Sequence, residues 1–208
     1  MLTFLALAAC TGTAPAFRGT QMSDFMPLDG ERQAEYINED SDNVPWKLVV
    51  EKVEPTTMSD GVELVTMEWY RDDTGEVVGS VIWSSTPGDS VLIHGFAVGS
   101  DSPTMFTTPV ALTDDDDLMH TGDSVVTETD GYTFTSTFVE MTDCPVNWGL
   151  EWTGCVHMDL DDGDGDDTTG PIFAGEYWLV ERYGPAWMLL TGYTEKWNLA
   201  HYDWSEDG

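Results

Sequence analysis

Apolar and polar residues alternate along most of the chain with a period of two residues. Phe134 and Phe138 fall on one face of their segment, with threonines on the other, and Trp46, Leu48 and Val50 share a face in the same way. Successive side chains of a strand point to opposite sides, so this pattern predicts β-strands that are half buried in a sheet. The period expected of an amphipathic helix is almost absent.

Turn signals rich in Gly, Asp and Pro separate these stretches, among them Asp72-Asp73-Thr74-Gly75, Pro87-Gly88-Asp89 and Asp130-Gly131. No helical segment is present that could carry a parallel crossover, so we expect an antiparallel all-β fold. It is either a β-sandwich or a strongly curved sheet that closes towards a barrel. About eleven strands are expected, at residues 33–39, 46–53, 62–70, 76–85, 90–98, 124–129, 132–141, 153–160, 174–183, 186–192 and 196–204.

The composition adds a large negative charge to this picture. The chain has 208 residues, with 39 Asp and Glu against 7 Lys and Arg, and its formal net charge is −32. Such a surface repels phosphate groups, which excludes nucleic-acid binding and membrane docking through a basic patch. Hydrophobic residues make up 41% of the chain, too many for a disordered acidic protein. We therefore expect a single, very acidic folded domain at residues 25–208.

The first ten residues, MLTFLALAAC, are apolar and end in small residues before a cysteine. The segment Leu7-Ala8-Ala9-Cys10 resembles the lipobox of bacterial lipoproteins, a family in which the cysteine becomes the lipid-bearing N-terminus. The resemblance implies a signal peptide at residues 1–9, followed by a lipid-anchored cysteine and flexible spacer at residues 10–24. It also implies a place in the outer membrane or on the surface of a Gram-negative cell. The signal is short and lacks a basic residue, so we expect it to be truncated.

Two further cysteines, Cys144 and Cys155, lie close together in the sequence. In an exported chain, which folds in an oxidising compartment, such a pair favours a disulfide. The alternative is a metal site formed by both cysteines and His157, but a fourth ligand at suitable spacing is missing. We therefore expect the disulfide.

An aspartate-rich run between Asp159 and Asp167 is interrupted by glycines. Calcium prefers many oxygen ligands, and a run of this kind can wrap carboxylates around one ion. The run resembles the calcium loops of dockerin-like and thrombospondin-type repeats, although the glycine and the last acid of an EF-hand loop are missing. It is either an acidic hairpin tip or a calcium site. The site would use Asp159, Asp161, Asp162, Asp164 and Asp166.

The sequence offers no catalytic residues. The four histidines are scattered, and neither a P-loop nor a G-x-S-x-G elbow is present, so we expect a protein that is not an enzyme. Nine tryptophans are present, and indoles either fill cores or bind sugars and other partners from the surface. Trp148 and Trp152, within the segment between the two cysteines, are the candidate ligand-binding pair.

Two segments carry a wider resemblance. One is Phe25-Met26-Pro27-Leu28-Asp29-Gly30, followed by Tyr36, and the other is Gly175-Glu176-Tyr177-Trp178-Leu179-Val180, followed by Gly184-Pro185. Both resemble the ends of a family of uncharacterised secreted lipoproteins from myxobacteria-like and related bacteria. The first segment carries an extra Met, and Ala34 stands where that family has a Trp. The resemblance implies an antiparallel β domain on the cell envelope and supplies no ligand-binding residues.

Together these features predict a cell-envelope lipoprotein whose β domain has a non-catalytic binding or structural role. One alternative is a calcium-dependent carbohydrate-binding module, which requires Trp148 and Trp152 to be exposed on one surface. The other is a carrier of an apolar ligand, which requires a curved sheet whose apolar concave face is left partly unfilled.

Overall fold

The computed structural model describes residues 21–26, 28, 31–57, 61–85, 90–114, 120–142, 154–163, 171 and 173–205. These residues form twelve strands in one antiparallel sheet, so the predicted all-β class is confirmed. A short 3-10 helix, η1 (Met22–Asp24), precedes the strands. The strands are β1 (Glu31–Asn38), β2 (Lys47–Thr57), β3 (Glu63–Arg71), β4 (Val77–Ser84), β5 (Leu92–Val98), β6 (Thr104–Ala111), β7 (Ser124–Thr129), β8 (Tyr132–Thr142), β9 (Cys155–Asp161), β10 (Gly175–Val180), β11 (Gly184–Leu190) and β12 (Trp197–Ser205).

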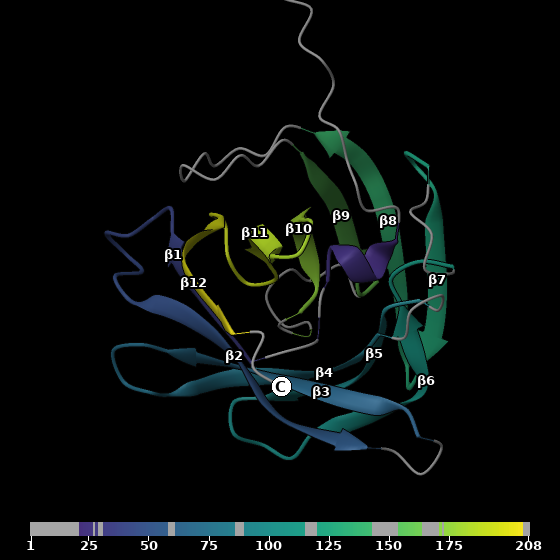
Figure 1. Ribbon diagram of the computed structural model, residues 1–208, viewed down its shortest axis with the longest axis horizontal. Helices are drawn as coiled ribbons and strands as arrows, with labels where there is room; N and C mark the ends of the chain where they lie inside the picture. The colour runs from purple at the N-terminus through teal and green to yellow at the C-terminus, as the bar shows by residue number, and fades with distance from the viewer. Residues whose placement is uncertain are drawn as a thin grey trace, which may run out of the picture.

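The sheet curls into a nearly closed barrel. Its strand order is β6-β5-β4-β3-β2-β1-β12-β11-β10-β9-β8-β7. Strands that are neighbours in sequence pair with each other, except β6 with β7, and β1 also pairs with β12. Figure 1 shows the sheet curving round until β6 and β7, the two ends of this order, lie side by side. Of the two predicted forms, the strongly curved sheet is the one observed.

The predicted strand faces and turns are observed where the structure describes them. Phe134 and Phe138 of β8 are both buried in the core. The turn Asp130–Gly131 joins β7 to β8, and its two residues have φ angles of 47° and 92°, which a two-residue hairpin turn requires. Asp72–Gly75 joins β3 to β4, whereas the turn predicted at residues 87–89 lies outside the described residues.

One strand, β6, is absent from the prediction. It contains Pro109, and a proline within an apolar run argues against a strand. In the structure the register of β6 against β5 jumps from Val110 to Met105, so residues 106–109 bulge out of the regular ladder. The strand also lies at the end of the ladder. An edge strand and a bulge are the two places where a sheet accepts a residue without a backbone N–H.

Side chains join β6 to β7 in place of a backbone ladder. The carboxylate of Asp130 accepts hydrogen bonds from the backbone N–H of Thr107 (2.6 Å) and from its hydroxyl (2.5 Å). Oγ1 of Thr129 accepts a hydrogen bond from the backbone N–H of Thr108 (3.1 Å). Oγ1 of Thr127 accepts a longer one from the backbone N–H of Ala111, at the end of β6 (3.4 Å). Two backbone amides of the bulge thus find acceptors across the gap. We call Thr107, Thr108, Thr127, Thr129 and Asp130 the seam.

Replacement of Asp130 by glycine tests the seam. Asp130→Gly keeps the turn, because glycine accepts a positive φ angle, but it removes both acceptors of Thr107. We expect the amide hydrogen of Thr107 to exchange with solvent about tenfold faster in the variant than in wild type. The reason is that the acceptor lost is an ionised group, which forms a strong hydrogen bond. Asp73→Gly, in the β3–β4 turn, is the matched control and should leave this rate unchanged. Equal exchange rates in the wild type and in Asp130→Gly, measured by NMR, would contradict a seam held by Asp130.

The hydrogen bonds to Asp130 also make the difference in stability between wild type and Asp130→Gly depend on pH. Hydrogen bonds from Thr107, with a further one from Thr129, hold the pKa of Asp130 below its usual value. The carboxylate therefore stabilises the fold above the pKa of the unfolded chain, and this contribution is lost as the pH falls through the lower pKa of the folded state. The difference in unfolding free energy between wild type and Asp130→Gly should narrow below about pH 4, as urea titration can measure.

Candidate functional site: a cavity inside the barrel

The concave face of the sheet encloses one large apolar core. Near the seam, aromatic rings fill this space, with centroids 5.4 to 6.4 Å apart in tilted, edge-to-face and stacked pairs. Rings at these distances are in favourable contact, so this part of the interior is well packed. The rings belong to Phe96, Phe106, Tyr132, Phe134 and Phe173.

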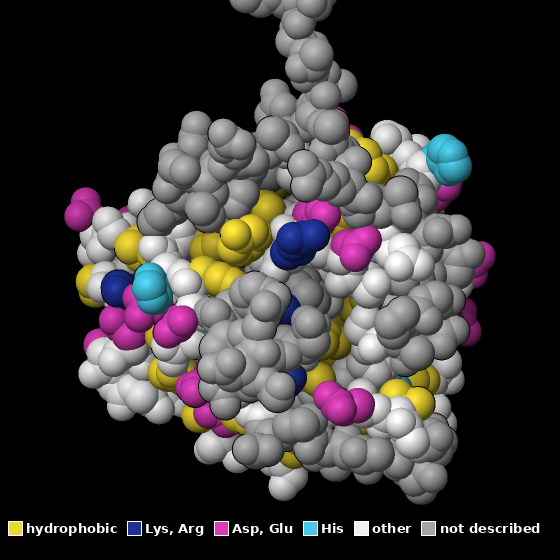
Figure 2. Space-filling model, in the orientation of Figure 1, with side chains coloured by type: hydrophobic (Ala, Val, Ile, Leu, Met, Phe, Trp, Pro, Cys, Tyr) yellow, Lys and Arg dark blue, Asp and Glu magenta, His cyan; other side chains and the backbone are white. Residues whose placement is uncertain are grey.

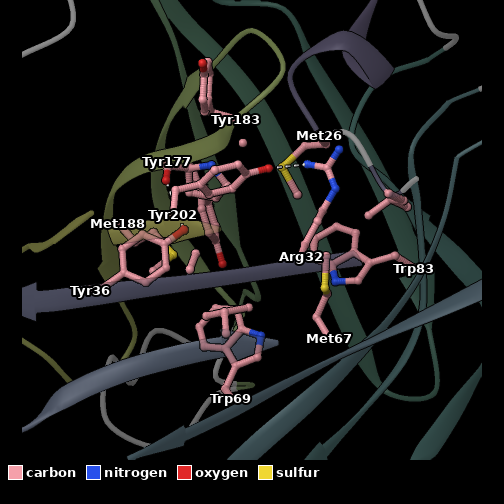
Figure 3. Close-up of a pocket in the computed structure, with 15 residues that line it drawn as sticks. Met26, Arg32, Tyr36, Met67, Trp69, Trp83, Tyr177, Tyr183, Met188 and Tyr202 are labelled. Atoms are coloured by element: carbon pink, nitrogen blue, oxygen red, sulfur yellow. Dashed lines mark hydrogen bonds between the residues drawn. The ribbon is translucent and has the colours of Figure 1, made fainter. Parts of the chain in front are cut away.

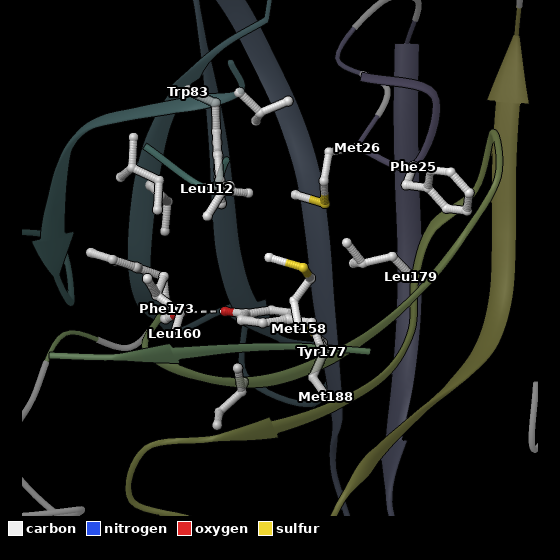
Figure 4. Close-up of a cluster of buried hydrophobic side chains, with 14 of the residues drawn as sticks. Phe25, Met26, Trp83, Leu112, Met158, Leu160, Phe173, Tyr177, Leu179 and Met188 are labelled. Carbon is white, nitrogen blue, oxygen red and sulfur yellow. Dashed lines mark hydrogen bonds between the residues drawn. The ribbon is translucent and has the colours of Figure 1, made fainter. Parts of the chain in front are cut away.

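A segment that precedes β1 fills the middle of the barrel. Met22 and Phe25 are completely buried, and Met26 and Leu28 are buried almost as fully. Figure 1 shows η1 inside the curl of the sheet. In Figure 4, Met26 lies among buried side chains of β9 and β10, such as Met158. We call residues 21–26 and 28 the plug.

Two hydrogen bonds from the barrel wall hold the plug. The backbone N–H of Arg182, in the β10–β11 turn, donates to the carbonyl of Asp24 (2.6 Å). From β2, Nζ of Lys52 donates to the carbonyl of Leu28 (2.8 Å). The prediction assigned residues 10–24 to a flexible spacer, and this is wrong for Met22–Asp24. These residues belong to the folded unit, because the side chain of Met22 is part of the core.

Beside the plug, the interior contains a cavity of about 70 Å³. This is room for roughly five water molecules, or for one small ring or a short alkyl segment. Its lining comes from the plug, from β1 to β4 and from β10 to β12. Figure 3 shows Tyr36 and Met188 on one side of it and Met67 and Trp83 on the other. Most of the lining is apolar.

Arg32 is the one charged side chain in the lining, as far as the structure describes the chain. It is only 8% exposed, and its Nη1 donates a hydrogen bond to Oη of Tyr202 (2.8 Å). The two residues come from opposite ends of the chain. They meet because β1 pairs with β12, where Ala34 lies opposite Tyr202.

The other buried phenols in the lining are neutral. Tyr36 donates to the carbonyl of Pro185 (3.0 Å), and Tyr177 donates to the carbonyl of Phe173. Burial raises the pKa of both tyrosines far above the usual value, so neither ionises near pH 7. The cavity thus combines an apolar wall, neutral phenols and one guanidinium.

The residues predicted for a site lie elsewhere. Cys155 is buried at the start of β9, where it pairs with Thr142 of β8, two residues from Cys144. The pairing of Cys144 with Cys155 stays a prediction. Outside the described residues lie Cys10, Cys144, Trp148 and Trp152.

The predicted calcium ligands are only partly brought together. Asp159 and Asp161 share the outer face of β9, whereas Asp162 is buried. Burial, and then the carboxylates of Glu176 and Asp161, raise the pKa of Asp159, and His157 acts in the opposite direction. Across the described residues, no group of three or more His, Cys, Asp or Glu side chains could hold a metal ion. Asp164 and Asp166 lie outside these residues.

His157, the third residue of the alternative metal site, has other partners. Its Nε2 lies 2.8 Å from a carboxylate oxygen of Glu176, and its ring stacks on Trp178 with centroids 4.3 Å apart. Lys196 lies over the same indole, with Nζ 4.0 Å from the ring centroid. The group forms part of the outer face of β9 and β10, separate from the cavity.

None of the cavity residues is among those predicted for a site, although one signal exists in the sequence. Arg32, Ala34 and Tyr36 are every second residue of β1 and share its core-facing side. A charged residue therefore lies on the buried face of a strand. The predicted strand begins at residue 33, and Arg32 falls just before it.

Comparisons with known proteins add no assignment. No protein-family model matches the chain, and neither a curated protein nor a solved structure matches it. Among the described residues, no helix has the length and apolar character needed to cross a membrane. The cavity is therefore the feature of the molecule from which a function can be inferred.

The plug can be tested by the same substitution at a buried and an exposed methionine. Met22→Ala should lower the free energy of unfolding by about 2–4 kcal/mol, because Met22 is completely buried. Met105→Ala, at a position 47% exposed, should cost less than about 0.5 kcal/mol. Urea denaturation measures both, and equal effects would show that the segment does not contribute to the core.

Proposed function

We propose that this protein is a non-catalytic binding protein that holds a small apolar ligand, or one short apolar chain, inside its barrel. The observation that carries the proposal is the unfilled part of the interior next to the plug. A curved sheet with an apolar, partly unfilled concave face is what the carrier hypothesis requires. The predicted envelope lipoprotein is then a binding protein whose ligand site is internal.

The energetics of packing support this proposal. Protein interiors are close-packed, and spaces larger than a water molecule are few. An empty apolar cavity of this size costs stability on the order of 1–2 kcal/mol, because the lining side chains lack contacts on one side. A ligand that fits the cavity restores those contacts.

The composition of the wall suits an apolar ligand of variable shape. Met26, Met67 and Met188 line the cavity, and methionine side chains are unbranched and adapt to irregular partners. On the face of the molecule in Figure 2, hydrophobic side chains are visible near the middle, whereas acidic ones are spread over the surface. The carbohydrate-binding alternative rests on Trp148 and Trp152, which lie outside the described residues.

The binding proposal is tested with straight-chain alcohols from butanol to decanol. We expect the affinity to rise about fourfold with each methylene until the cavity is full, and then to level off. Ala34→Phe, which fills the cavity, should abolish binding. Ile37→Phe, at an exposed position of the same strand, is the matched control and should leave it unchanged.

Calorimetric titration measures these affinities, and circular dichroism confirms that both variants are folded. The absence of alcohol binding at every chain length would contradict the proposal, as would undiminished binding by folded Ala34→Phe.

We also propose that the chain is held at the cell envelope by a lipid on Cys10, on the strength of the lipobox resemblance. In a cell that supplies a complete signal peptide, Cys10→Ser should move the protein from the membrane fraction to the soluble fraction. Cys144→Ser, which removes another cysteine, should leave it in the membrane fraction. Immunoblots of the two fractions measure this. Continued membrane association of Cys10→Ser would rule out the anchor.

A further inference from the structure

The interior contains a second, smaller cavity of about 20 Å³ beside the one already described. This is room for about one water molecule or one methyl group. Three side chains line both cavities and so form a partition between them, namely Met26, Trp83 and Tyr177. Figure 4 shows Met26 directed towards Met158, which lines the smaller cavity only.

The smaller cavity suits an apolar group better than a water molecule. A buried water needs about two to four polar partners. The side chains of the lining include two hydroxyl groups. Ser136 donates its hydroxyl hydrogen to the carbonyl of Leu112 (2.7 Å), and Tyr177 donates to the carbonyl of Phe173. All the other side chains of the lining are hydrophobic, so a methyl group fits this space well.

Of the three partition residues, Met26 is the one whose side chain can move. Trp83 and Tyr177 carry rigid rings on β4 and β10. Methionine is unbranched and has three rotatable bonds, so it adapts to irregular spaces. Hydrogen bonds from the barrel wall to the carbonyls of Asp24 and Leu28 hold the backbone on either side of Met26. A movement here is therefore a change of the side-chain rotamer.

We propose that Met26 determines the range of chain lengths that the larger cavity accepts, and that the ligand is an unbranched alkyl chain. This inference rests on the proposed function and deepens it. When the end of a long chain reaches the partition, the Met26 side chain turns into the smaller cavity. The larger cavity then lengthens by about one methylene group. Because the wall retracts at one point, the site grows longer but not wider, which benefits a chain and not a ring.

The smaller cavity is what makes this movement favourable. In the free protein both cavities leave lining atoms without contacts on one side. In the complex the ligand fills the larger cavity and the Met26 side chain fills the smaller one, so both sets of contacts are restored. Without the smaller cavity the same movement would overpack the core, which forces side chains away from their preferred rotamers.

Met26→Leu tests the partition, because leucine has a similar volume but is branched and stiffer. Straight-chain alcohols from butanol to decanol are titrated into the full chain by calorimetry. We expect the affinity to level off about one methylene earlier than in wild type, so that the longest alcohols bind about fourfold more weakly. Butanol and cyclohexanol, which stay within the larger cavity, should bind as in wild type. Met105→Leu, the same change at an exposed methionine, is the control and should keep the wild-type limit.

A second variant fills the smaller cavity itself. Ser136→Thr keeps the hydroxyl and adds one methyl group to a side chain that lines only this cavity. Met26 then lacks the room to retract, so the longest alcohols should again bind about fourfold more weakly. Ser124→Thr, at an exposed position of β7, is the matched control. This variant also serves if circular dichroism shows that Met26→Leu does not fold.

NMR detects the movement of Met26 directly. Leu160 lines the smaller cavity and not the larger one. The nuclear Overhauser effect between the ε-methyl of Met26 and the methyls of Leu160 should strengthen when the longest bound alcohol is added. Butanol should leave it unchanged.

The outcomes separate the two proposals. An unchanged length limit in folded Met26→Leu or Ser136→Thr overturns the role of Met26 and leaves the proposed function standing. A Met26 methyl that does not respond to long alcohols also overturns this role, as does an equal loss of butanol and cyclohexanol binding. Failure of every alcohol to bind to the wild type overturns the proposed function itself.

Discussion

Closure of the sheet at the seam is the constraint on which the interior of this protein depends. An open twelve-stranded sheet would present two unpaired edges and an apolar concave face to water. The backbone of β6, which contains Pro109, forms no ladder with β7. Asp130 and Thr129 supply the missing acceptors, and the concave face becomes an enclosed interior. The core, the plug and the cavity all lie in that interior.

The interior is filled in two ways, and the difference between them produces the cavity. Next to the seam, aromatic rings from β5, β6 and β8 pack against one another. In the middle, the plug brings Met22 and Phe25 in from outside the sheet. The plug is a short segment, and Arg182 and Lys52 of the wall donate hydrogen bonds to its carbonyl groups. The space that it leaves, bounded by flexible methionines and by Arg32, is the candidate site.

The local parts of this structure were predictable from sequence and the long-range parts were not. Alternation around Phe134 and the turn at Asp130–Gly131 depend on neighbouring residues, and both are observed as predicted. Strand β6 is absent from the prediction because it contains Pro109. A sheet accepts this proline because β6 lies at the end of the ladder, which the local sequence does not reveal. The lining of the cavity brings together residues far apart in the sequence, such as Arg32 and Tyr202, 170 residues apart, and no local pattern specifies this. The plug left a weaker signal, since Met22, Phe25 and Met26 have the spacing of one helical face.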